Sequence, residues 1–149
     1  MKVFIYKTIE GNVCVGTSIS EDVEHIAKIT VPINTEFFIV ESESLPSEPQ
    51  DAWVLQEDGS IIIDQEKVVQ IKRQQMTALT KRQFNLVLYD KGLLTQVKEL
   101  LSQDERTQIE FDSTDTITRL HPTVIQLAKD LGLTEEKVDV LWTEALAIN

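Results

Sequence analysis

The apolar residues of this 149-residue chain change their spacing near Asp64, from alternation at every second position to recurrence every three or four positions. Alternation places apolar side chains on one face of a strand, whereas the longer spacing places them on one face of a helix. The strands of a sheet are therefore expected in the first part of the chain and helices in the last part. The sequence predicts an α+β protein with an acidic α+β domain at 1–63, a connector helix at 64–79 and an all-helical bundle domain at 80–149.

The first part is predicted to form a small antiparallel sheet with one helix. Residues 3–9 and 13–19 are rich in β-branched residues and are separated by Glu10-Gly11-Asn12, a sequence that tolerates the positive φ of a hairpin turn. The other elements expected here are a helix capped by Ser20 with Val23, Ile26 and Ala27 inward, a strand at 36–40 buried on both faces, an exposed loop at 41–50, and a hairpin of 51–55 with 61–63 around Asp58-Gly59.

Short, individually capped helices are predicted in the last part. Thr80, Ser102 and Thr134 each precede acidic or amide residues, so their hydroxyls can accept from the free amide groups of a first helical turn. Gly92 and Gly132 are placed to end helices in the left-handed conformation. The expected helices run from Asp64 to about Met76, through Phe84 to Leu88, through Leu93 to Leu101, over 107–120, from Pro122 to Leu131, and from Thr134 through Val138, Leu141, Trp142 and Ala145. Within 107–120 the alternation of Ile109, Phe111 and Ser113 is also compatible with a strand.

The net charge of −11 lies mainly in the first part. Residues 1–63 contain 3 basic and 11 acidic side chains, residues 64–79 contain 3 and 2, and residues 80–149 contain 8 and 12. So acidic a chain is a poor ligand for a phosphate backbone, because affinity for nucleic acid comes largely from Lys and Arg. We therefore expect no nucleic-acid partner. The acidic groups either keep the protein in solution or bind a basic patch on another protein.

The sequence lacks the residue patterns typical of catalysis and of metal binding. His25 and His121 have no second ligand at a metal-binding spacing, and Cys14 is the only cysteine, in an alternating run that predicts a buried thiol. Phosphate-binding glycine loops and nucleophile motifs are missing as well. There is no run of about 18 apolar residues and no basic-then-apolar leader pattern. We expect no enzyme activity, no metal, no cofactor and no membrane partner.

Several short motifs follow one another along most of the chain. They are Asp51-Ala52-Trp53, Gly59 with a helix from Asp64, Thr80-Lys81-Arg82-Gln83-Phe84, Gly92-Leu93-Leu94, Gln108-Ile109-Glu110-Phe111, His121-Pro122, Leu131-Gly132-Leu133-Thr134 and Val138-Asp139-Val140-Leu141-Trp142. Their order resembles the small tail-fibre-associated assembly or accessory proteins of tailed bacteriophages and prophages, with Phe111 where that pattern has a tryptophan. The resemblance implies a chaperone-like protein without catalytic residues that binds a phage tail fibre or tail protein. Its expected location is the host cytoplasm during assembly, or the virion tail.

Five residues are the candidate partner-binding contacts. Trp53 is an indole near a loop, where it either completes the core or anchors a partner. Val68 and Ile71 form a narrow apolar stripe on the expected connector helix, and Leu146 and Ile148 lie at the end of the last expected helix. Either pair could join two copies in a homo-oligomer. The alternative function is a phage-encoded inhibitor of a host defence protein, with Glu36, Glu41, Glu43, Glu48 and Asp51 as the acidic surface that it would use.

Overall fold

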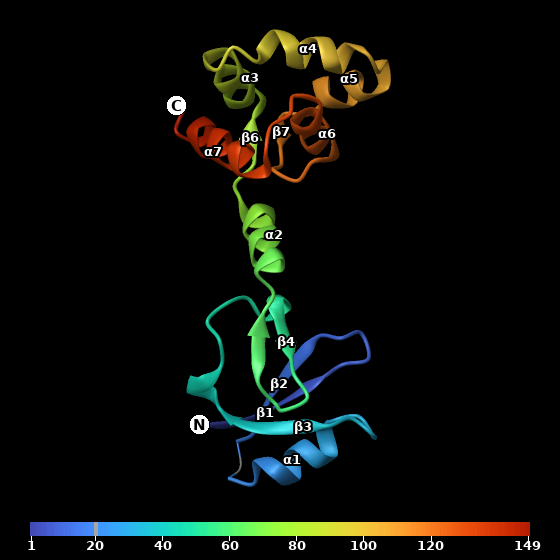
Figure 1. The fold of residues 1–149 in the computed structure, drawn as a ribbon, viewed down its shortest axis with the longest axis vertical. Coiled ribbons are helices and arrows are strands. Elements are labelled where there is room, and N and C mark those ends of the chain that lie inside the picture. The colour runs from blue at the N-terminus through green and yellow to red at the C-terminus, as the bar shows by residue number, and fades with distance from the viewer. Residues whose placement is uncertain (20) are drawn as a thin grey trace. The chain divides into compact units, whose positions relative to one another are not determined.

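The computed structural model describes residues 1–19 and 21–149 and divides into two compact units, residues 1–71 and 72–149. Strands dominate the first unit and helices the second, so the protein has the α+β fold that the sequence predicts (Figure 1). The boundary falls inside helix α2, Gln65–Gln75, within the expected connector. The backbone N–H of Lys67 donates to the Asp64 carboxylate at 3.1 Å. This contact confirms a helix that begins after Asp64.

The first unit is built on a three-stranded antiparallel sheet in the order β2-β1-β3. The strands are β1 (Lys2–Lys7), β2 (Val13–Thr17) and β3 (Phe37–Glu41). The predicted first hairpin is confirmed, since β1 pairs with β2 and the connecting loop contains Gly11 at φ +89°. Because β1 is the central strand and its side chains alternate, Phe4 and Ile5 enter two separate apolar clusters on opposite faces.

A different layer covers each face of this sheet, as Figure 1 shows. Helix α1, Val23–Thr30, packs on the face of Phe4 through Val23 and Ala27. The hairpin of β4 (Trp53–Leu55) and β5 (Ile61–Ile63) packs on the face of Ile5 through Trp53 and Leu55. Its turn contains Gly59 at φ +84°, which confirms the predicted second hairpin.

Three local predictions for the first unit meet a different outcome. Burial of the third strand on both faces is wrong at Ile39, which is 39% exposed, because β3 is an edge strand. The predicted cap Ser20 lies outside the described residues, and the Asp22 carboxylate accepts from the His25 N–H at 3.0 Å instead. The expected loop at 41–50 contains a 3₁₀ turn, Ser42–Ser44, and leads into a second one, Gln50–Ala52.

The second unit packs helices around one apolar core. Its elements are β6 (Leu79–Thr80), α3 (Lys81–Asp90), α4 (Leu94–Ser102), α5 (Glu105–Asp112), β7 (Thr116–Ile117), α6 (Pro122–Asp130) and α7 (Glu135–Leu146). The prediction of an all-helical domain is wrong, because β6 and β7 form a two-stranded antiparallel ladder with Leu79 opposite Ile117. Both of these side chains are buried in the core.

The predicted helix at 107–120 is correct only as far as Asp112. A run of Ser and Thr follows, and the hydroxyls of Ser113 and Thr114 donate to the carbonyl oxygens of Ile109 and Glu110. Such hydroxyls compete with the helical backbone for hydrogen bonds. The chain then becomes extended, and Ile117 reaches the core by pairing with β6.

Most of the predicted helix ends are confirmed. Thr80 and Gln83 form a reciprocal capping box at the start of α3, and the Thr134 hydroxyl accepts from the Lys137 N–H at the start of α7. Gly92 and Gly132 have φ of +70° and +67°. Ser102 is the exception, because it is the last residue of α4 and Asp104 caps α5.

Candidate partner-binding surfaces

A charged cluster in the second unit joins α7 to two segments that are distant in sequence. Asp139 on α7 accepts from Arg73, at the end of α2, with donor–acceptor distances of 2.9 Å to Nη2 and 3.0 Å to Nε. Its other oxygen accepts from Nε of Arg119, between β7 and α6, at 2.8 Å. Glu135, one turn earlier on α7, accepts from Nη2 of Arg119 at 2.8 Å. Two guanidinium groups and two carboxylates therefore neutralise one another.

Burial makes this cluster important for folding. Arg119 is 1% exposed and Arg73 is 6% exposed, and Nη1 of Arg119 has no hydrogen-bond partner among the described residues. Burial alone would raise the pKa of Asp139, but the hydrogen bonds and charges of the two arginines outweigh it and hold that pKa below its ordinary value. The hydrogen bond to Asp139 in turn raises the pKa of Arg73. We interpret the cluster as a contact that stabilises the fold of the second unit, since its charges pair with one another.

The predicted partner contacts lie in different surroundings. Trp53 is buried, and its indole N–H donates to the carbonyl oxygen of Glu48 at 2.8 Å, which matches the core alternative. Val68 is only 5% exposed and Ile71 is half-buried, so Val68 does not lie on the surface of the folded chain. Ile148 packs against the core of the second unit, whereas Leu146 is 36% exposed. Their roles in partner binding stay predictions.

The other candidate chemical groups are also dispersed. His25 is exposed on α1, and Nδ1 of His121 accepts from the Thr123 N–H at the start of α6. Cys14 is only half-buried, beside Tyr6, so the prediction of a buried thiol is wrong. Within residues 1–19 and 21–149, no three His, Cys, Asp or Glu side chains are grouped to hold a metal ion. The same residues include no helix with the length and apolar character that a membrane crossing requires.

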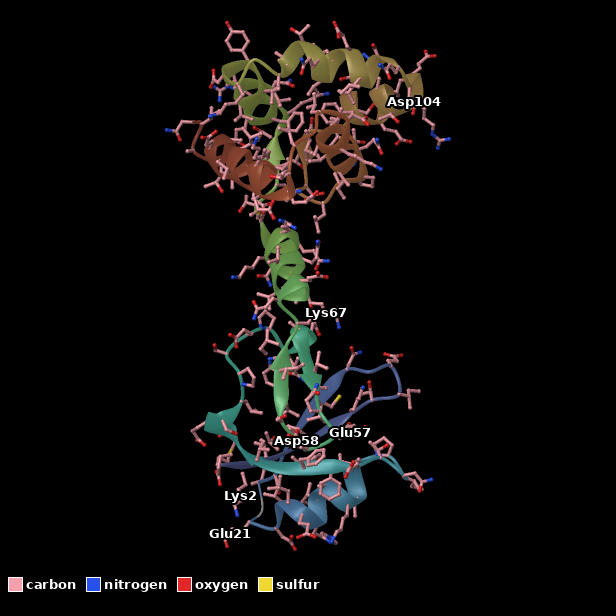
Figure 2. The ribbon with its side chains drawn as sticks, viewed as in Figure 1. Lys2, Glu21, Glu57, Asp58, Lys67 and Asp104 are labelled. Atoms are coloured by element: carbon pink, nitrogen blue, oxygen red, sulfur yellow. The ribbon has the colours of Figure 1, made fainter. Side chains whose placement is uncertain are left out.

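An exposed recess lies at one end of the first unit, where three connections meet. It is lined by Lys7, Thr8, Ile9, Asn34, Thr35, Glu36, Phe38, Leu55, Gln56 and Glu57. Figure 2 labels Glu57 and Asp58 in the turn between β4 and β5. This turn lies close to β3, since a Cβ at Gly59 would be 2.5 Å from the ring of Phe38. Ile9 is fully exposed at the recess, and Ile33, next to the lining residue Asn34, is 92% exposed. We call this surface the loop recess.

A second, more apolar recess lies on the second unit along α7. Its lining residues are Lys91, Leu93, Leu133, Lys137, Val140, Leu141 and Glu144. Val140 is 58% exposed, and Lys91 and Glu144 form an ion pair of 2.8 Å at the rim. We call this surface the α7 groove. Sequence periodicity correctly assigns Val138, Trp142 and Ala145 of α7 to the core. It also assigns Leu141 inward, but Leu141 is only half-buried and lines the groove beside Leu93 and Leu133.

No protein-family model, curated protein or solved structure matches this chain. The two recesses are therefore the observations from which a function can be inferred. Both combine exposed apolar side chains with charged rims, an arrangement that suits the binding of another polypeptide.

Proposed function

We propose that this protein is a non-enzymatic tail-fibre assembly or accessory factor of a tailed phage, and that it binds a fibre or tail protein through the loop recess. The observation that supports this proposal is the exposure of Ile9 and Ile33 beside one recess. Apolar side chains gathered at an exposed site gain free energy when a partner covers them. The order of short motifs along the chain, which resembles tail-fibre-associated proteins, points to the class of partner.

The charge of the same unit supports a second candidate function, inhibition of a host defence protein. Residues 1–71 contain 4 basic and 13 acidic side chains, a net charge of −9, whereas residues 72–149 contain 10 and 12, a net charge of −2. Glu36 and Glu57 line the loop recess itself. A basic surface that normally binds nucleic acid would be attracted to this end of the unit. The two candidates therefore differ in whether apolar contact or charge dominates binding.

Binding of the purified protein to its cognate fibre or tail protein tests the proposal. Ile9→Asp with Ile33→Asp should abolish binding, because a charge buried in an apolar contact without a partner costs several kcal/mol. Ile29→Asp is the matched control, since Ile29 is 67% exposed on α1 and does not line the recess. Circular dichroism should show that all variants fold, because the replaced side chains are exposed.

Charge reversal separates the two candidates. Glu36→Lys with Glu57→Lys should weaken binding only modestly if apolar contacts dominate, and added salt should have little effect. Steep salt dependence and complete loss on charge reversal, with Ile9→Asp tolerated, would favour the inhibitor instead. Absence of any affinity between the wild-type protein and the fibre would refute the assembly role.

A further inference from the structure

The exposed face of α7 carries opposite charges at its two ends, so it is complementary to an antiparallel copy of itself. Lys137, Val140, Leu141 and Glu144 all line the α7 groove, at spacings of three, one and three residues. Each helical residue advances about 100° around the axis, so these side chains occupy one face. The basic residue lies at one end of this face and the acidic residue at the other.

A second α7 helix that packs antiparallel on this face brings opposite charges together. In an antiparallel pair whose two-fold axis passes between Val140 and Leu141, Lys137 faces Glu144 of the partner subunit, and the same contact forms again across the axis. Val140, 58% exposed, then lies at the centre and packs against the partner's Leu141.

The ionic contacts already present at the rim are consistent with this pairing. Glu144 bonds Lys91 of its own chain at 2.8 Å and is 44% exposed, so its carboxylate can accept from a second cation. Lys137 is exposed and makes no ion pair within the described part of the chain. A shift of the axis by half a residue, onto Val140, would set Glu136 opposite the partner's Glu144, and like charges there oppose association.

We propose that two copies of this chain associate in an antiparallel pair through their α7 grooves. The occupant of each groove is the α7 face of the second copy, with Val140 as the central apolar contact and Lys137 with Glu144 as the flanking pairs. Helix α7 has 12 residues and is about 18 Å long. A contact of this length belongs to the small end of specific interfaces, so the dimer should dissociate in the micromolar range or above.

This association goes beyond the proposed function and does not depend on it. The α7 groove belongs to residues 72–149 and the loop recess to residues 1–71, so a variant at one surface leaves the other unchanged. Failure of dimerisation with intact fibre binding would overturn only the pairing. Loss of fibre binding in an Ile9→Asp variant that still dimerises would concern only the loop recess.

Sedimentation equilibrium of the full chain across the micromolar range tests the pairing. The wild type should show a concentration-dependent monomer–dimer equilibrium. Val140→Asp should weaken association at least about tenfold, because each copy places a charge at the centre of the contact. The control is Ile109→Asp, a similar change at an apolar residue of α5 that is also 58% exposed and does not line the α7 groove; it should leave the equilibrium unchanged.

Charge reversal fixes the register. Lys137→Glu alone and Glu144→Lys alone should each be monomeric, because each sets like charges against each other at both ends of the contact. A mixture of the two variants should recover association, since every charge then faces an opposite one. A wild type that stays monomeric, Val140→Asp that dimerises normally, or a mixture that fails to associate while the wild type dimerises would each overturn the proposal.

Discussion

Asp139→Asn should strongly destabilise the second unit, because it removes the carboxylate shared by two buried guanidinium groups. Arg73 and Arg119 would then repel each other across a neutral amide, which can accept from one of them but offers N–H groups to the other. Breaking a buried ion pair from one side typically costs about 3–5 kcal/mol. Since the Asp139 side chain is 24% exposed, we expect a smaller loss, about 2–4 kcal/mol.

Urea unfolding at neutral pH measures this loss. The chain has two tryptophans, so a Trp53→Phe background leaves Trp142, buried three residues after Asp139 on α7, as the reporter for the second unit. Asp112→Asn is the matched control, because the Asp112 carboxylate also pairs with a cation, Lys81 at 3.1 Å, but is 60% exposed. An exposed pair of this kind should contribute about 0–1 kcal/mol.

The pH dependence provides a second measurement of the same contact. The pKa of Asp139 is lower in the folded chain than its ordinary value near 3.9, so its contribution is present above about pH 4 and is lost as the pH falls through the folded value. The difference in unfolding free energy between wild type and Asp139→Asn should therefore shrink below pH 4. A difference in unfolding free energy under about 1 kcal/mol at pH 7, or one that does not change as the pH is lowered, would show that the cluster does not stabilise the second unit.

Three further outcomes are expected. Gly59→Ala should destabilise the first unit by more than Gly92→Ala destabilises the second. Both glycines have positive φ, but a Cβ at Gly59 would lie 2.5 Å from the Phe38 ring, whereas one at Gly92 would meet nothing within 4 Å. Thermal unfolding followed by circular dichroism should therefore show a loss of about 1–2 kcal/mol for Gly92→Ala, from backbone strain only, and a larger loss for Gly59→Ala. Thr80→Ala should cost about 1 kcal/mol by urea titration through loss of the capping box, with the exposed Thr95→Ala nearly neutral. Chelator should not change the melting temperature, and a drop of several degrees would reveal a structural metal.

Local signals in the sequence determined most of the elements and their ends. The change of apolar period near Asp64, the Thr80 cap and the left-handed Gly92 and Gly132 depend on interactions among residues a few positions apart, so they could be predicted without a tertiary structure. The buried face of α7, with Val138, Trp142 and Ala145, could be predicted for the same reason. Ser102 was assigned wrongly because Asp104, two residues later, is an equally suitable cap.

Only the tertiary structure decided the features that join distant segments. Thr116 and Ile117 became a strand because Leu79 and Thr80 supplied a backbone partner, and no periodicity within 107–120 could show that. The shared carboxylate of Asp139 likewise depends on residues from two other segments. Both recesses are lined by side chains from separate elements. Sequence patterns indicate which face of an element is apolar. Packing across the whole unit determines which neighbouring element covers that face and whether the face stays exposed.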